Sequence, residues 1–324
     1  MFNNTFDSQK MFMTSKKIYN IFGNSKYLCL CGSAIDIYDI DTLEYKNTIE
    51  KVPYYNYHQF VSEDEIVIKT AEGKYCCYNI SDGICTWKRK LSPGGAPQDK
   101  SMYAYKNIII SSCLGYIYNE KYKLDHMERF FCIFDIEKDT LERYEYLCDI
   151  NNEKVLCGGE FIVAENESEA FYLVQNQLYR LTFPEITFKK INQCICGSVS
   201  HRGNYVYSRV ADNDPRILIL LNRETTNEVV YTDCINHETY VIDKCVADNN
   251  GEQKTIDFKY ACFSENDHYI ILVYKQGFRL YDTVSRKTMF SKTDIEGRFG
   301  VNIIGRKVFY NVKGSVYCID LKNE

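Results

Sequence analysis

The feature that most constrains the fold is a unit of four short strand-like runs separated by tight turns. It is clearest in residues 256–290, where runs of β-branched and aromatic residues are separated by Ser264–Asp267, Lys275–Gly277 and Asp282–Ser285. Such a pattern predicts four antiparallel strands joined by turns. Because a single four-stranded sheet cannot bury both of its faces, the unit must recur along the chain.

The closing half of this unit, a strand followed by a turn and another strand, recurs six times. The copies are residues 32–46, 73–87, 129–142, 176–188, 215–228 and 314–324. Together with the opening copy they place a turn-forming residue after an apolar or aromatic one at Asp39, Asn79, Asp135, Thr182, Asn222, Asp282 and Asp320. These short side chains can bond their own backbone and begin a turn.

The spacing of these seven positions, roughly 40 to 60 residues, is typical of propeller blades. The sequence therefore predicts an all-β fold, a seven-bladed β-propeller of four-stranded antiparallel blades that forms a single domain over residues 1–324. The last copy ends after its third strand, whereas residues 15–22 are strand-like and belong to no blade. We expect residues 15–22 to complete the last blade and close the ring, which would remove two open sheet edges.

The chain resembles a known fold family in these repeats. Phe263–Tyr269 followed by Leu280–Thr283 is similar to the turn and closing dipeptide of a WD repeat, and the whole chain resembles the WD-repeat and quinoprotein-like β-propellers. The Trp-Asp dipeptide of WD repeats is replaced here by Tyr-Asp, Phe-Asp, Ile-Asp, Tyr-Asn or Leu-Asn. The resemblance implies a propeller fold and, for function, only a tendency.

Charge and composition indicate which partners to expect. The 44 acidic and 39 basic residues are mixed along the chain and give a net charge of −5, so no basic field for nucleic acid is expected. The N-terminus lacks the pattern of an export signal, and no long apolar run occurs. The sequence therefore predicts a cytoplasmic protein without a membrane partner, whose 15 Cys are reduced and buried.

Three segments exceed the length that the repeat requires. They are residues 92–100, 114–128 and 233–251, and all are predicted to be loops on one face of the propeller, whereas the turns between third and fourth strands stay short. Variable loops on a rigid scaffold are typical of a binding surface. Neutral drift is the alternative explanation of their length.

Aromatic and histidine side chains gather in these segments and in the link between the first two blades. Large, fairly rigid side chains lose little entropy on contact with a partner. The predicted partner-binding residues are Tyr54, Tyr55, Tyr57, His58, Tyr116, Tyr118, Tyr122, His126, His237 and Tyr240. The alternative for the first four is that one or two fill the centre of the ring or open the next strand.

No motif of catalytic or metal-binding chemistry emerges from the sequence. The pairs Cys29/Cys31 and Cys194/Cys196 each fall on one side of a strand, but their spacing is not that of a zinc site. None of the five His lies in a recognisable catalytic motif, and no glycine-rich loop precedes a helix. The cluster Glu165, Glu167 and Glu169 is interpreted as a solvated turn. No catalytic residue, metal ligand or cofactor is predicted.

Together these features predict a non-catalytic protein-interaction scaffold or recognition subunit that binds protein partners through its loop-rich face. Two alternatives remain open. One is an enzyme or small-ligand-binding propeller that uses the central pocket. The other is a sensor or inhibitor subunit of a multi-protein system.

Overall fold

The structure is a computed structural model of the whole chain. It describes residues 8–13, 17–50, 52, 55–70, 74–90, 95–96, 102–119, 124–163, 168–174, 177–190, 204–207, 210–211, 214–215, 217–222, 228–233, 238–244, 258–264, 268–293, 295 and 299–321. The chain divides into two compact units, which are described separately. Unit 1 comprises Met1–Lys46, Ser198–Arg209 and Asp214–Glu324, and unit 2 comprises Asn47–Gly197 and Val210–Asn213.

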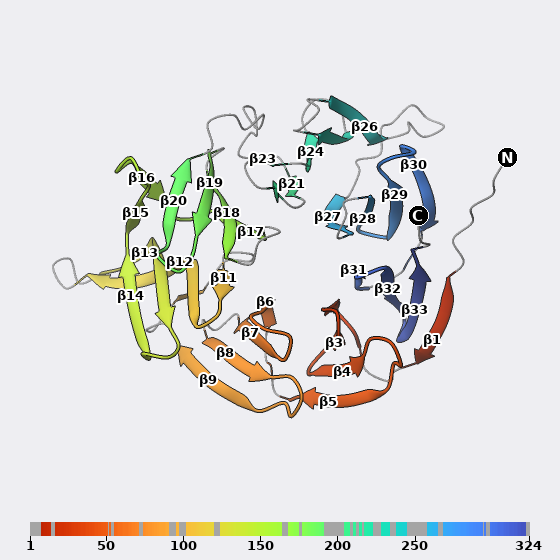
Figure 1. The fold of residues 1–324 in the computed structure, drawn as a ribbon, viewed down its shortest axis with the longest axis horizontal. Coiled ribbons are helices and arrows are strands. Elements are labelled where there is room, and N and C mark those ends of the chain that lie inside the picture. Colours follow the sequence, from red (N-terminus) through yellow and green to blue (C-terminus); the bar gives the residue numbers. More distant parts are fainter. Residues whose placement is uncertain are drawn as a thin grey trace. The chain divides into compact units, whose positions relative to one another are not determined.

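Antiparallel β-sheets make up the described part of the chain (Figure 1). It contains six four-stranded sheets and one five-stranded sheet, and no helix is assigned there. The predicted all-β class and the repeated four-stranded antiparallel sheets are therefore confirmed for these residues. The short strands β22 (Val210–Ala211) and β23 (Asp214–Pro215) lie outside these seven sheets.

The first sheet opens unit 1, and three further sheets follow late in the chain. The first consists of β2 (Asn20–Gly23), β3 (Tyr27–Cys31), β4 (Ile35–Asp39) and β5 (Tyr45–Ile49). The next has β21 (Asn204–Tyr207), β24 (Ile217–Asn222), β25 (Glu228–Asp233) and β26 (Glu238–Lys244). The last two are β27 (Phe258–Phe263), β28 (Tyr269–Tyr274), β29 (Gly277–Asp282) and β30 (Lys287–Lys292), and β31 (Val301–Ile304), β32 (Lys307–Val312), β33 (Ser315–Asp320) and β1 (Gln9–Met13).

Unit 2 contains three large sheets and one hairpin. They are β6 (Tyr55–Phe60), β7 (Glu65–Thr70), β8 (Lys74–Asn79) and β9 (Cys85–Lys90); β10 (Gly95–Ala96), β11 (Met102–Tyr105), β12 (Ile108–Asn119), β13 (Leu124–Asp135) and β14 (Thr140–Tyr144); and β17 (Glu160–Val163), β18 (Glu169–Val174), β19 (Gln177–Thr182) and β20 (Thr187–Lys190). The hairpin is β15 (Tyr146–Cys148) with β16 (Lys154–Leu156).

The N-terminal strand that joins the last sheet differs from the predicted one. β1 at Gln9–Met13 pairs with β33, whereas the segment predicted for this role, residues 15–22, contributes its end to β2 at Asn20–Gly23, which pairs with β3. Ile18 and Ile21 are buried in the core cluster around the first and last sheets of unit 1. The apolar residues of this segment therefore mark a first strand of the first sheet, one short turn away from β3.

In the sheet that contains residues 217–222, the strands occupy other positions than predicted. Residues 217–222 were expected to be a third strand, but β24 is the second strand of its sheet, and Asn222 ends it. The fourth strand, β26, lies inside residues 233–251, which were predicted to be a loop. The predicted loop at residues 114–128 also contains strands, because β12 and β13 extend into it from both ends.

The predicted turn chemistry is confirmed where the side chains are described. A side-chain oxygen accepts a hydrogen bond of 2.8 to 3.1 Å from a backbone N–H two or three residues later in Asp39, Asn79, Asp135 and Asp282. Such bonds replace part of the ladder lost where the chain reverses. The repeat of polar residues at strand ends thus has a local cause.

Apolar side chains between neighbouring sheets form the cores within each unit. In unit 2, Phe131 packs 5.5 Å from Tyr172 and 6.1 Å from Phe188, measured between ring centroids, and all three are nearly inaccessible to solvent. In unit 1, Phe278 lies 4.9 Å from Tyr310 of the next sheet. These sheets therefore bury a face against a neighbouring sheet of the same unit, as the recurrence of the four-stranded unit requires.

Candidate interaction surface

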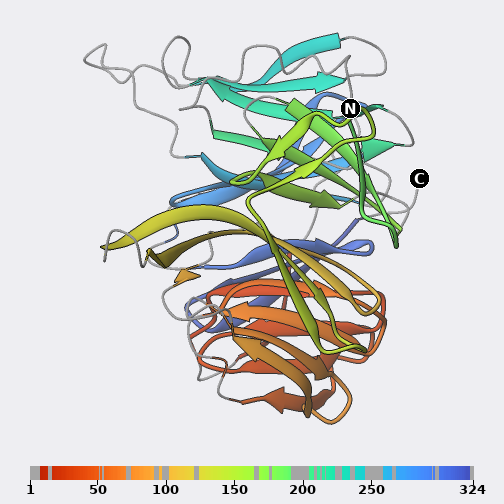
Figure 2. The same ribbon diagram turned by 90° about the vertical axis from the view of Figure 1, so that its left-hand side faces the viewer.

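The longest strands of the described chain form a β-ribbon that continues beyond its own sheet. β12 and β13 are 12 residues long and pair without a register shift from Ile108↔Asp135 to Asn119↔Leu124. β14 pairs with β13 only as far as Phe131, and β10 pairs with β12 only at Leu114 and Gly115. Figure 2 shows this yellow strand pair running past the other strands of its sheet.

We define the ribbon as Tyr116–Asn119 of β12 and Leu124–Met127 of β13. Among the described residues, these two segments pair with each other and with no third strand. Register places Tyr116 opposite Met127 and Tyr118 opposite Asp125. Directly opposite residues of an antiparallel pair share a face, so both tyrosines fall on one face of the ribbon, and His126, opposite Ile117, falls on the other.

Of the ten predicted contact residues, the structure places three in the ribbon, namely Tyr116, Tyr118 and His126. Tyr55, Tyr57 and His58 lie in β6, and Tyr240 lies in β26. Tyr54, Tyr122 and His237 lie outside the described residues. Two of the predicted insertions do meet within unit 2, because Gly95 and Ala96 of residues 92–100 pair with Gly115 and Leu114 of residues 114–128.

His58 is part of a strand rather than of a loop. It lies opposite Ile68 in β7, and its ring meets Phe60 edge-on, with 6.4 Å between centroids. Burial lowers the pKa of His58 to about 3, so its imidazole is neutral at pH 7. His58 thus contributes no positive charge to this region.

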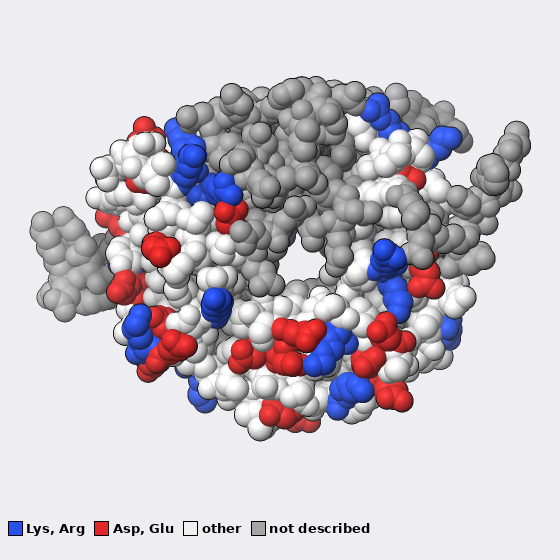
Figure 3. Space-filling view, in the orientation of Figure 1, with Lys and Arg blue, Asp and Glu red and all other residues white. Residues whose placement is uncertain are grey.

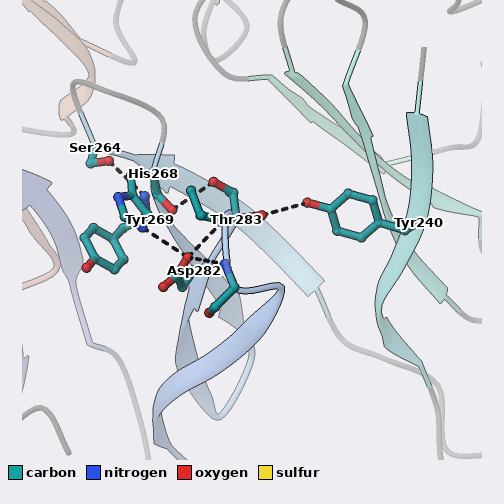
Figure 4. A network of polar contacts seen from close by, with 8 residues as sticks. Tyr240, Ser264, His268, Tyr269, Asp282 and Thr283 are labelled. Carbon is teal, nitrogen blue, oxygen red and sulfur yellow. Dashed lines mark hydrogen bonds and ion pairs between the residues drawn. The ribbon is translucent and has the colours of Figure 1, made fainter. Parts of the chain in front are cut away.

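Tyr240 joins two neighbouring sheets of unit 1. Its hydroxyl lies 3.5 Å from the backbone oxygen of Thr283, to which it donates, and the guanidinium carbon of Arg286 lies 4.4 Å from the centre of its ring. Figure 4 shows the Tyr240 side chain reaching from β26 to the turn after β29. These contacts give Tyr240 a role in holding the sheets together, which the sequence pattern did not suggest.

A buried polar network supports the same turn (Figure 4). His268 Nε2 lies 3.1 Å from Asp282 Oδ1, and both residues are buried. The hydroxyl and backbone N–H of Thr283 donate to the His268 backbone oxygen, and Ser264 Oγ accepts the Tyr269 N–H at 3.0 Å. The His, Asp and Ser side chains therefore tie strand ends to each other within residues 256–290.

A buried cluster of polar and thiol side chains, which the sequence pattern did not indicate, lies at the base of the ribbon. Tyr75 donates to Ser111 Oγ at 2.7 Å, and its hydroxyl lies 3.5 Å from Cys113 Sγ. Cys132 hydrogen-bonds to Cys113, which lowers the pKa of Cys113 and raises that of Cys132. Lys69 is also fully buried in unit 2, and its charge acts on Cys113 in the same direction. Alternation of side chains along a strand can predict that each of these residues points inward, but it cannot predict that β8, β12 and β13 bring them together.

Most of the other described thiols are packing residues. Eight of the eleven described cysteines are buried, as predicted. Burial raises the pKa of Cys31 and that of Cys318 to about 12, so these thiols are protonated at neutral pH. Among the described residues, no group of three or more His, Cys, Asp or Glu is arranged to hold a metal ion.

Charges on the surface are mixed. On the face shown in Figure 3, Lys and Arg side chains are interspersed with Asp and Glu side chains over the described part.

Within the described part of the chain, no helix has the length and apolar character needed to cross a bilayer.

Comparison of the sequence with known protein families and with curated proteins finds no match to either.

Proposed function

We propose that the protein is a seven-bladed β-propeller that acts as a non-catalytic protein-interaction module, and that a protein partner contacts the ribbon. The observation that carries this proposal is the eight-residue strand pairing of Tyr116–Asn119 and Leu124–Met127, which extends past every other strand of its sheet. A sheet needs no such extension to bury its core, whereas a projecting pair of strands offers two faces and two edges to a partner.

Three further observations support the module. Seven sheets of four or five strands follow one another along the chain, and β1 adds a strand from the N-terminus to the last of them. In a propeller this addition closes the ring. The buried thiols fit a reducing compartment, so we place the protein in the cytoplasm.

The ring itself has a direct test in solution scattering. A compact closed fold of this length has a radius of gyration of about 20 Å. A clearly larger value would show that the seven sheets do not close on each other. This measurement is independent of any partner.

Site-specific cross-linking tests the binding role. A photoreactive phenylalanine analogue placed at Tyr118 is expected to cross-link a defined protein in cells of the source organism. The same analogue at Tyr45, which is 58% exposed in β5, serves as the control. If both positions gave the same products, or if Tyr118 gave none, the ribbon would not be the binding element.

A further inference from the structure

The end strands of the sheets either carry a basic residue or lie against a neighbouring sheet, and among the described residues the strand segments of the ribbon have neither feature. One end strand of each sheet carries a basic residue: Lys10 in β1, Lys46 in β5, Lys88 in β9, Arg143 in β14, Lys189 in β20, Lys244 in β26 and Lys287 in β30. A charge on an edge strand discourages pairing with another chain. The strand at the opposite edge of each sheet lies beside the corresponding strand of a neighbouring sheet. In unit 2, β6 and β17 lie beside β11, and in unit 1, β21 and β31 lie beside β27 and β31 also lies beside β2.

By contrast, the strand segments of the ribbon contain no Lys, Arg or Pro, and Asp125 is their one acidic residue. Lys121 and Lys123, which connect the two strands, lie outside the described residues. Among the described residues no third strand pairs with the ribbon, so its edges can still accept a strand.

The direction of the backbone groups follows from the ladder. Ile136 N donates to Asn107 O at 2.8 Å, and the register from there to Asn119↔Leu124 has no shift. Residues of an antiparallel pair alternate between those that bond the partner strand and those that face away. The even-numbered residues of β13 therefore bond β12, whereas the N–H and C=O groups of Asp125 and Met127 face away from it.

The opposite edge of the same strand pair already accepts a strand. Gly95 and Ala96 of β10 pair antiparallel with Gly115 and Leu114 of β12, immediately before the ribbon begins. This two-residue strand comes from a segment that the repeat does not require. Strand addition beside the ribbon therefore already occurs within the chain, which favours an extended strand as the partner of the other edge.

We propose that the β13 edge of the ribbon binds an extended segment of a partner protein by strand addition, with Asp125 and Met127 supplying the backbone donors and acceptors. The inference rests on the proposed function and names its partner class: a proline-free segment rich in β-branched and aromatic residues, recognised mainly through its backbone.

A proline at Met127 tests this geometry. Met127→Pro removes an outward N–H without removing a bond to β12, and proline is tolerated on edge strands in this position. The matched control Met127→Ala removes the side chain and keeps the N–H.

The probe is a set of short linear peptides selected on the full-length protein from a random phage-displayed library. We expect Met127→Pro to weaken their binding by about tenfold or more, which corresponds to about 1.4 kcal/mol, and Met127→Ala to leave it unchanged. In the wild type, the bound peptide should slow amide hydrogen exchange at Asp125 and Met127, a readout that needs no variant.

Equal binding by Met127→Pro and wild type would overturn the inference, as would an equal loss in Met127→Ala. In those cases the proposed function stands if Tyr118 still cross-links its partner. Peptides that bind equally well after removal of the whole ribbon would overturn the inference, and absence of the Tyr118 cross-link would overturn the proposed function separately.

Discussion

In the sheet β27–β30 the second and third strands pair over six residues, from Tyr269↔Asp282 to Tyr274↔Gly277, whereas in the sheet β10–β14 the corresponding strands pair over twelve. Both third strands end at an aspartate, Asp282 or Asp135, whose side chain starts the next turn. The two sheets therefore agree at the end where the third strand stops. They differ at the opposite end, where Lys275 and Gln276 connect β28 to β29 but the whole ribbon lies between the corresponding parts of β12 and β13.

This difference teaches where the fold tolerates change. Near the shared aspartate, side chains such as Phe134 and Leu280 are fully buried between sheets. At the other end the pairing of β12 with β13 continues after both neighbouring strands have stopped, so the additional residues pair with no third strand among the described residues. Stability should thus depend on one end of a sheet and recognition on the other.

The largest effect should come from the core of the ribbon's own sheet. Phe131→Ala removes a fully buried ring between Tyr172 and Phe188 and should lower the free energy of unfolding by about 3–5 kcal/mol. Tyr144, directly opposite Phe131 in the register but 37% exposed, is the control, and Tyr144→Ala should change it by less than about 1 kcal/mol. Chemical denaturation measures both, and equal losses would contradict this division of the sheet.

The next effect is a pH dependence that arises from His58. Its pKa is lowered from 6.5 to about 3 in the folded protein, so the unfolded chain binds more protons between these values. The contribution of His58 is complete above pH 6.5 and is lost as the pH falls toward 3, and at pH 5 about 2 kcal/mol should be gone.

Denaturation curves at pH 7 and pH 5 check this expectation for His58. His58→Gln should show a smaller loss between the two pH values than the wild type, because glutamine does not titrate in this range. Identical losses would mean that other groups cause the acid sensitivity and that His58 is not held neutral.

A smaller effect is expected at the turn of the regular sheet. Asp282→Ala removes the acceptor for the Val284 and Ser285 N–H groups and the partner of His268, and should cost about 1–3 kcal/mol. Asp41, whose side chain is 84% exposed in the turn after β4, is the control, and Asp41→Ala should cost less than about 1 kcal/mol. If the order of the two costs were reversed, the buried network would not be what stabilises this turn.

Much of the scaffold could be predicted from local chemistry. The strand at Tyr27–Cys31, the strand at Lys307–Val312 and the turn at Asp282 follow from β-favouring runs ended by a turn residue, and such signals need no distant contact. The buried position of most cysteines follows in the same way, from the apolar character of their strands.

Other elements could not be predicted because non-local pairing decides them. Gln9–Met13 and residues 15–22 have a similar share of polar residues, yet Gln9–Met13 forms the strand on β33, whereas Ile18 and Ile21 are buried in the core cluster around the first and last sheets of unit 1. Asn222 resembles the other turn residues but ends a second strand, because β26 provides the fourth. Gly115, just before the ribbon, and Asn119 at its end indicate a loop, and the strands of the ribbon form through pairing with each other.

The most direct test of the division between scaffold and ribbon is a variant in which residues 116–127 are replaced by Asn-Gly. Gly115 and Glu128 are opposite each other and, by the alternation of the ladder, form a hydrogen-bonded pair, which a two-residue turn can close. We expect a free energy of unfolding within about 1 kcal/mol of the wild type, together with complete loss of peptide binding. Retained binding, or a chain that no longer folds, would contradict it.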